Sequence, residues 1–450
     1  MAKVRSRCLF FIQTLIIFKL FTAIPVFSLE IIRDTELEQF TDELITSLLN
    51  KEDINLDNIN VYFIKSDQVN AFVTGGTNIF INTELIIESD DYREYAAVLA
   101  HELAHIIGGH IFNTSIELSN LSNRAFPIYL LGIIGIMAGA AETGLAGVMV
   151  GQASVADGFT FYSRTQEASA DQAAVSMLCK SGINGEFLIS FLNKLERMEI
   201  AKFSDNQNYR STHPLTSNRI NWINSSLKSL NSCEYDEELQ LTKRYNLIRA
   251  KLHGFTHPFD ETEAVYSSTS DTDLYATAVS SYFKGEHKRS IKNLEELIKT
   301  NPTNPFYKEL LGEIYYANGN HDVASQYQEK AINEIEIDND LYYMMMGNYL
   351  LSSENIDDIN NAIIYLKKSI QINQKNAYSW YLLARAYAET NQIHLANYAT
   401  AERYFLIGER KLSYEFAIKA SKNIEEYSPE WYRSSDLIEI LKKEVSNKSE

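Results

Sequence analysis

The sequence His-Glu-Leu-Ala-His at residues 101–105 is the strongest single indication of fold and chemistry in this chain of 450 residues. It lies in an apolar run from Tyr95 to Ile107, which predicts one helix. Two imidazoles four residues apart lie on one helical face, so His101 and His105 can bind one Zn²⁺ while Glu102 meets a water molecule beside it. The pattern is typical of a zinc peptidase with one zinc ion per chain.

A catalytic zinc takes a third protein ligand and keeps one position for water. A third histidine six residues after His105 would fall at Ile111, and His110 is one position short, so we expect its side chain to point off the metal face. A glutamate on a second helix is the other solution, and Glu167 suits it. Asp171 lies one turn further on the same face, where it can hydrogen-bond a liganding histidine or the reacting water.

Further segments accompany these two motifs along the chain. They are residues 70–76 (Asn-Ala-Phe-Val-Thr-Gly-Gly) followed by a strand pattern at 79–81, residues 99–105, residues 162–164 leading into 167–171, and His213-Pro214 with Arg219. Together they resemble the gluzincin family that contains the CAAX prenyl endopeptidases and HtpX. The resemblance covers nearly the whole chain after residue 28, and the order of a catalytic and a repeat domain is similar to that of periplasmic members of the family.

The resemblance implies a set of roles at the metal. His101, His105 and Glu167 would be the zinc ligands. Glu102 would be the general base, and Asp171 would be an acid that assists the leaving group.

The resemblance also implies roles for residues outside the two helices. His213 would approach the zinc and occlude it, or contact the oxyanion, whereas the alternative is a loop histidine fixed by Pro214. Arg219 would lie near Asp171 or the substrate carbonyl, the alternative being an ordinary arginine on a helix surface. Arg164 is a further candidate to assist the tetrahedral intermediate.

The N-terminus has the pattern of a secretory signal. Lys3, Arg5 and Arg7 precede a mostly apolar stretch, and small residues near its end allow cleavage after Ser28. We therefore predict a signal peptide at 1–28 and a periplasmic location. An uncleaved anchor is the alternative, although Lys19 interrupts the apolar stretch.

The predicted mature chain is strongly acidic and keeps two cysteines. Removing residues 1–28 takes away four basic residues and no acid, which lowers the formal net charge from −18 to −22 and makes nucleic acid a poor partner. Cys179 and Cys233 could pair in an oxidising compartment. The sequence does not give the distance that a disulfide needs, so the pairing stays open.

The length after residue 28 exceeds one hydrophobic core, which predicts two domains. We expect an α+β, mostly α protein, with a metallopeptidase domain at 29–255 and a solenoid of tetratricopeptide (TPR) repeats at 270–445. The first domain should contain a helix at 29–49 and a small sheet with strands at 61–64 and 79–82, residues 70–77 forming a loop or a strand. The edge of this sheet could bind an extended polypeptide through its main chain, which favours broad specificity.

A run rich in Ile, Leu, Gly, Ala and Met extends from Phe126 to Val150. Its uninterrupted part is shorter than the roughly 20 residues that a membrane span needs. Three interpretations remain: a buried or cleft-lining helical hairpin, a mobile lid over the cleft, or a segment in peripheral contact with the membrane.

The C-terminal pattern matches the TPR template at a regular spacing. Small residues recur at Ala278, Gly312, Gly347 and Ala384, so that successive positions are 34, 35 and 37 residues apart. We attribute the longest step to an extra loop at 352–360. Residues 401–443 are expected to add at least one further helical pair as a cap.

These features predict a secreted zinc endopeptidase whose substrate is polypeptide. The resemblance implies action on misfolded or assembling outer-membrane proteins, with the TPR groove recruiting clients or the outer-membrane assembly machinery, and chaperone activity. The alternative is mainly a TPR chaperone or scaffold with an occluded or silent protease site. An intact Glu102 argues against a silent site, because zinc binding alone does not need it. An integral-membrane prenyl-type peptidase is disfavoured by the lack of full-length spans around the motif.

Overall fold

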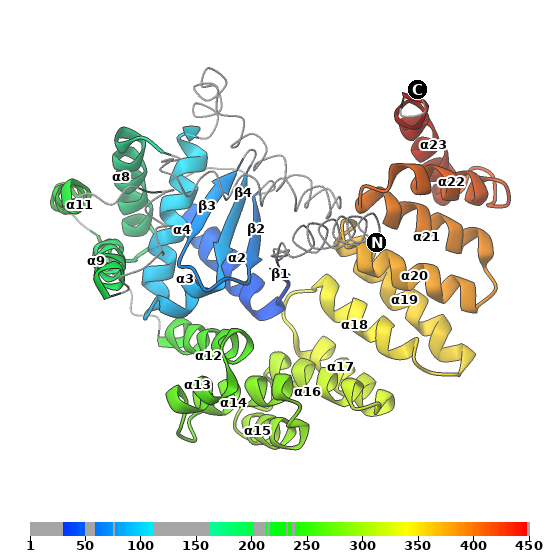
Figure 1. Ribbon diagram of the computed structural model, residues 1–450, viewed down its shortest axis with the longest axis horizontal. Helices are drawn as coiled ribbons and strands as arrows, with labels where there is room; N and C mark the ends of the chain where they lie inside the picture. The colour runs from blue at the N-terminus through cyan, green and yellow to red at the C-terminus, as the bar shows by residue number, and fades with distance from the viewer. Residues whose placement is uncertain are drawn as a thin grey trace, which may run out of the picture. The chain divides into compact units, whose positions relative to one another are not determined.

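Figure 1 shows the computed structural model of the chain, which describes residues 30–49, 59–74, 77–110, 162–201, 213, 217–230, 233–235 and 239–447. By its internal contacts the chain divides into Met1–Glu30 and Ile31–Glu450, and the description below concerns the second unit. The predicted signal peptide at 1–28 and the apolar run at 126–150 lie outside the described residues. The predicted domain boundaries near 255 and 270 stay predictions.

A four-stranded mixed sheet supports the metal-site helix. Its strands are β1 (Ile31–Ile32), β2 (Asn60–Ile64), β3 (Ala71–Thr74) and β4 (Asn78–Asn82), in the order β1-β2-β4-β3. The β2 and β4 strands are parallel, whereas β1 and β3 pair antiparallel to their neighbours. The β3 strand is therefore an edge of the described sheet. Both predicted strands are present, and residues 70–77 contribute a strand rather than only a loop.

The two faces of the sheet follow the strand period of two. Alternate residues, among them Val73, Ile79 and Ile81, belong to the hydrophobic core shared with the helices. On the other face the rings of Phe72 and Phe80 stack at a centroid distance of 5.3 Å. This alternation fixes the register, because a slip by one residue would place the core residues on the wrong face.

The first described helix, α2 (Thr35–Leu49), begins later than the predicted start at residue 29. Ile31 and Ile32 instead pair with β2 as strand β1. The Asp34 carboxylate accepts a hydrogen bond from the Leu37 backbone N–H at 2.9 Å and so caps the helix. The apolar pattern extends through both elements, which is why the sequence alone did not separate them.

The metal-site helix, α4 (Tyr92–Ile107), follows the short helix α3 (Thr83–Glu88). It begins three residues before the predicted Tyr95, because Asp91 caps it by accepting a hydrogen bond from the Arg93 N–H at 2.9 Å. Figure 1 shows α4 between the sheet and α8 (Arg164–Lys180), and it contacts both.

Helix α8 is held at both ends. At its N-terminus Ser163 and Gln166 form a reciprocal capping box. At its C-terminus Cys179 forms a disulfide with Cys233, which lies beyond α11 (Ser217–Ser229), and the two Cα atoms are 5.2 Å apart. The pairing that the sequence left open is therefore present in the structure.

Two further helices complete the first core, which extends from Leu37 to Leu252. They are α9 (Glu186–Ala201) and α12 (Leu239–Thr256). Helix α12 also crosses α14 (Asp271–Lys284) closely, since a Cβ added at Gly254 would lie 2.3 Å from the Ala276 carbonyl oxygen. Glycine is required at this crossing.

The C-terminal region is a series of paired helices, as predicted. After α13 (Phe259–Val265) the pairs are α14 (Asp271–Lys284) with α15 (His287–Thr300), α16 (Pro305–Ala317) with α17 (His321–Glu334), α18 (Asp340–Leu350) with α19 (Ile356–Ile372), α20 (Ala377–Glu389) with α21 (Ile393–Leu406), and α22 (Arg410–Ser421) with α23 (Pro429–Asn447). The four recurring small residues all lie on the first helix of a pair. At Gly347 a Cβ would meet the Leu366 side chain at 2.5 Å, so the small residue lets the two helices approach.

The longest repeat differs from its prediction. The extra loop expected at 352–360 ends at Asn355, whose side chain accepts a hydrogen bond from the Asp357 N–H and caps α19. Helix α19 has 17 residues, whereas α15 and α17 have 14 each. A longer helix therefore accounts for most of the 37-residue step. Within the described ranges, we find no helix that is both long enough and apolar enough to span a membrane.

Candidate metal centre

Four side chains that the sequence singled out converge in the buried interior. Helix α4 supplies His101 and His105, α8 supplies Glu167, and His213 comes from the segment before α11. All four are 0% exposed. One candidate ligand atom from each lies within 4.8 Å of every other. The spacing of four residues places the two α4 histidines on the face that α8 covers.

The distances within this group fit a tetrahedral cation. The Nε2 atoms of His101 and His105 are 3.1 Å apart, and His105 Nε2 lies 3.3 Å from Glu167 Oε1. His213 Nδ1 lies 3.3 Å from His101 Nε2 and 3.1 Å from Glu167 Oε1. Ligands about 2.0–2.1 Å from a tetrahedral zinc would be separated by roughly 3.3–3.4 Å. The residues present thus fit the metal that the motif implies.

His213 presents its Nδ1 lone pair to the other ligands. Its Nε2 lies 3.2 Å from the carbonyl oxygen of Ala71, which can only accept a hydrogen bond. The Nε2 atom therefore carries a proton, and Nδ1 is the nitrogen that a cation could bind. Because Ala71 lies on β3, His213 touches both the ligand group and the edge strand.

Glu102 lies beside the ligands with unused hydrogen-bonding capacity. Both carboxylate oxygens are buried, and neither has a hydrogen-bond partner among the described residues. The nearest ionisable contact is His213 Nε2, 3.3 Å from Oε1. Burial raises the pKa of Glu102, against the opposing charges of His213 and His101. A buried carboxylate of raised pKa without a donor is suited to accept a proton from a water molecule.

Asp171 and Arg219 form a buried support behind the ligands. Arg219 Nε and Nη2 donate to the two oxygens of Asp171, each at 2.8 Å, and Arg219 Nη1 lies 2.7 Å from Glu167 Oε2. Asp171 Oδ1 also lies 3.0 Å from His101 Nδ1. Arg219 is only 1% exposed, which excludes the alternative of a surface arginine.

The charges of the group depend strongly on one another. Burial lowers the pKa of His101, but Glu167 and Asp171 outweigh it and raise that pKa to about 9. Burial raises the pKa of Glu167, but His213 and Arg219 outweigh it and hold the pKa well below its ordinary value. Burial keeps the pKa of His105 well below normal. The site thus combines an ionised carboxylate with imidazoles, and a cation would compete with the His101 proton.

His110 contacts the candidate ligand His105, which the sequence analysis did not predict. It is not among the four ligands, but its Nδ1 lies 2.9 Å from Nδ1 of His105. Gly109 has a φ of +62°, and a Cβ at Gly108 would lie 2.6 Å from His110 Nε2. The Gly-Gly pair therefore lets His110 fold back onto His105 after α4 ends. This pair was the available sequence signal.

Tyr162 and Arg164 also differ from the sequence analysis. The Tyr162 ring stacks on His105 with centroids 3.7 Å apart, and the residue is 3% exposed. Its place in the quoted 162–164 segment was a signal for this contact. Arg164 is exposed at the start of α8. Within the described ranges no interaction joins it to the candidate ligands, so its supporting role stays a prediction.

In this site the helix that carries His101 and His105 packs against a helix that carries a carboxylate ligand. This is the arrangement of a metallopeptidase. Residues 32–226 match Peptidase family M48, and residues 308–336 match the tetratricopeptide repeat. The chain therefore carries a peptidase family M48 domain and TPR repeats, and it is a metalloendopeptidase.

Curated relatives carry a more specific name. The chain is 23% identical over 411 residues to the Beta-barrel assembly-enhancing protease of Escherichia coli K12, which covers 88% of this chain and 81% of that protein. It is 27% identical over 203 residues to the protein of that name from Yersinia pestis, covering 43% of this chain and 39% of that one. The crystal structure of MamA matches at a TM-score of 0.28 and 17% identity, covering 38% of this chain and 96% of MamA.

Proposed function

We propose that this protein is a periplasmic zinc endopeptidase that acts on misfolded or assembling outer-membrane proteins. The observation that carries the proposal is the convergence of four ligand atoms beside Glu102, whose carboxylate accepts no hydrogen bond from the described residues. His101, His105 and Glu167 would hold the zinc. When bound, zinc would lower the pKa of a water molecule and polarise the scissile carbonyl.

The surrounding residues would prepare this reaction. Glu102 would take the proton from the attacking water and pass it to the leaving amine. Asp171 is engaged by Arg219 and faces His101 Nδ1, so we propose that it orients this imidazole. Both oxygens of Asp171 accept hydrogen bonds from Arg219, which favours this orienting role over the implied role as an acid for the leaving group.

The edge strand would position the substrate. An extended polypeptide can add to β3 through main-chain hydrogen bonds, which are indifferent to the substrate's side chains. The Ala71 carbonyl that would take part now faces His213 Nε2. Substrate binding would therefore have to displace His213.

His213 supports a second candidate function. Its Nδ1 stands where a tetrahedral zinc would keep its water position, and its Nε2 covers part of the edge strand. We propose a resting state in which the protease is occluded, so that the protein acts mainly as a TPR chaperone or scaffold until His213 moves. A fourth protein ligand would make hydrolysis conditional.

Location and partners are proposed from several features together. The Cys179–Cys233 disulfide is typical of an oxidising compartment. It agrees with the predicted signal peptide at 1–28 and with the names of the relatives. We propose that the TPR repeats bind clients or the outer-membrane assembly machinery. Peripheral membrane contact through 126–150 stays a prediction.

Metal analysis tests the ligand assignment. We expect the purified protein to keep one tightly bound zinc after dialysis against metal-free buffer, and casein cleavage to stop when a chelator removes it. His105→Ala and Glu167→Ala should each lose most of this zinc, whereas the matched α8 variant Arg164→Ala should keep it. Full zinc in Glu167→Ala would contradict the third-ligand assignment.

His213→Ala separates the roles proposed for that residue. If His213 occludes the site, the variant should retain zinc and cleave casein several-fold faster, because water and substrate gain access. His394→Ala, on α21, serves as the control. A slower variant with full zinc would instead indicate contact with the oxyanion. Equal rates would leave His213 as a loop-packing residue.

His110→Ala should weaken zinc binding by about 10–100-fold, as loss of a partner of a liganding histidine typically does. The reason is that His110 Nδ1 holds the second nitrogen of His105. Competition against a chromophoric chelator measures the affinity. His110→Asn, which keeps a hydrogen-bonding side chain, should recover part of it, and an unchanged affinity in His110→Ala would remove this role.

A further inference from the structure

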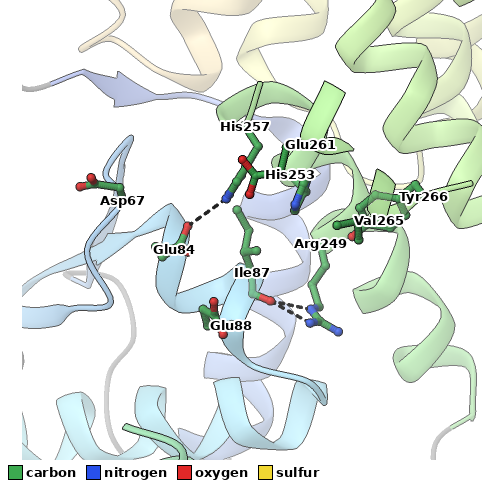
Figure 2. Close-up of a pocket in the computed structure, with 10 residues that line it drawn as sticks. All are labelled: Asp67, Glu84, Ile87, Glu88, Arg249, His253, His257, Glu261, Val265 and Tyr266. Atoms are coloured by element: carbon green, nitrogen blue, oxygen red, sulfur yellow. Dashed lines mark hydrogen bonds and ion pairs between the residues drawn. The ribbon is translucent and has the colours of Figure 1, made fainter. Parts of the chain in front are cut away.

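A second group of candidate ligands lies far along the chain from the metallopeptidase motif. His253, His257 and Glu261 follow at intervals of four residues, and one ligand atom from each lies within 4.8 Å of the others. His253 is on α12, His257 immediately follows it, and Glu261 is on α13. Figure 2 shows His257 reaching toward Glu84, with Glu261 and His253 beside it.

A threonine hydroxyl lies within hydrogen-bond distance of the Nδ1 atom of each histidine. His257 Nδ1 lies 2.9 Å from Thr256 Oγ1, which itself donates to the Leu252 carbonyl at 2.9 Å. The hydroxyl proton is thus already used, so His257 Nδ1 must be the donor and Nε2 is left with a lone pair. His253 Nδ1 lies 3.2 Å from Thr262 Oγ1, a second contact between a ring nitrogen and a threonine hydroxyl. Such second hydrogen bonds orient imidazoles that bind metals.

The lone pair of His257 faces a carboxylate. Its Nε2 lies 3.8 Å from Glu84 Oε2, which is beyond a hydrogen bond. A neutral imidazole nitrogen and a carboxylate oxygen are both acceptors, so both can bind one cation between them. Glu84 is on α3, and it brings a fourth candidate ligand from a separate element.

The surroundings favour a positive ion. A cavity of about 460 Å³ adjoins the group, and four carboxylates line it: Asp67, Glu84, Glu88 and Glu261. The Arg249 guanidinium also lines the cavity, but it donates to the Ile87 carbonyl at 2.8 and 3.0 Å. Figure 2 shows this arginine turned away from the histidines.

We propose that His253, His257 and Glu261, with Glu84 opposite them, form a second metal site for a divalent cation of the zinc class. Two imidazoles with carboxylates suit Zn²⁺, Ni²⁺ or Co²⁺, whereas Mg²⁺ and Ca²⁺ prefer oxygen ligands alone. The two rings now stack with centroids 4.0 Å apart and 11° between their planes. Binding requires one ring to tilt, so that the lone pairs converge as they do at His101 and His105, whose rings cross at 79°.

The site would be structural. It would join α3, which follows the β4 strand, to the end of α12 and to α13, just before the first repeat pair. An ion bound there stabilises the folded chain by mass action, because the unfolded chain does not hold the ligands together.

Zinc titration of two backgrounds tests the proposal. In His101→Ala/His105→Ala, which loses two ligands of the first group, we expect one weaker equivalent of Zn²⁺ and a rise in Tm when zinc is added. When His253→Gln and His257→Gln are added to this variant, both the weaker zinc binding and the rise in Tm should be abolished. Adding His287→Gln and His321→Gln, from the repeat region, should leave both unchanged.

The otherwise wild-type chain provides an independent readout. Starting from metal-free protein, we expect it to bind two equivalents of zinc, and His253→Gln/His257→Gln to bind one and to cleave casein once that zinc is bound. One equivalent in the wild type, or two equivalents in His253→Gln/His257→Gln, would overturn the second site. If the wild-type protein did not cleave casein, that result would count against the proposed peptidase activity. The expected number of bound zinc ions would not change.

Discussion

Replacing Glu102 by Gln is expected to lower the rate of casein cleavage by roughly 10²–10⁴-fold, the usual contribution of a general base. The amide has nearly the same shape and can still hydrogen-bond water, but it cannot accept a proton at neutral pH. Because both oxygens of Glu102 lack hydrogen-bond partners among the described residues, the substitution breaks no such bond there. We therefore expect the Tm and the tightly bound zinc to stay close to those of the wild type.

Zinc content, Tm and single-turnover cleavage measured on one preparation separate loss of chemistry from loss of fold. Glu415→Gln, an exposed carboxylate on α22, is the matched control for the charge change. Undiminished cleavage in Glu102→Gln would refute the role of Glu102 as base. Loss of zinc together with activity would show that the carboxylate supports the metal rather than the proton transfer.

The parts of the site that were predictable from the sequence are those fixed by local geometry. A spacing of four residues places His101 beside His105, and Glu167 beside Asp171, wherever the two helices lie. The contact between the helices is tertiary, and so is the approach of His213 to Ala71. The need for a third zinc ligand indicated the second helix in advance, the resemblance to known peptidases indicated that His213 approaches the metal, and nothing indicated its contact with Ala71.

Two histidine groups illustrate the limit of helical spacing. His110 is not among the candidate ligands, as expected, but its contact with His105 was not predicted, because it depends on where α4 ends. The Gly108-Gly109 turn ends the helix and returns His110 to His105. His257 likewise lies just past the end of α12, so the regular spacing around it was not recognised as a ligand pattern.

The fold followed the same division between local and tertiary determinants. The repeats were predictable because each small residue, such as Gly347, has a packing role that recurs with each helical pair. The start of α2 was not predictable, because Ile31 and Ile32 pair with β2 although the apolar pattern continues from them into the helix. The loop after α18 was overestimated because the Asn355 cap begins α19 early.

Arg219→Ala is expected to destabilise the metal-free protein by about 3–5 kcal/mol, the usual cost of removing one partner of a buried ion pair. The guanidinium is almost fully buried and contacts both Asp171 and Glu167. Its removal leaves two carboxylates without their shared cation. Arg219→Lys, which keeps the charge but loses the paired geometry, should recover only part of the stability.

The pH dependence of this effect follows from the two carboxylates. Burial raises the pKa of Asp171, but hydrogen bonds from Arg219 and His101 outweigh it and lower the pKa below its ordinary value. The pKa of Glu167 is lowered for related reasons. A lowered pKa gives stability that is fully present above the unfolded-state value, about 4, and is lost as the pH falls from there through the lower folded-state value. In Arg219→Ala the positive charge that opposes the effect of burial is missing, so the pKa values of Asp171 and Glu167 rise. These carboxylates therefore take up protons at higher pH.

The difference in unfolding free energy between wild type and Arg219→Ala should therefore be largest near pH 8 and shrink toward pH 5. Denaturant unfolding of both proteins at the two pH values, without metal, measures it. A difference that does not change with pH would mean that lost packing, not unpaired charge, causes the destabilisation. Zinc should restore part of the stability at pH 8, because a cation bound by Glu167 replaces part of the missing positive charge.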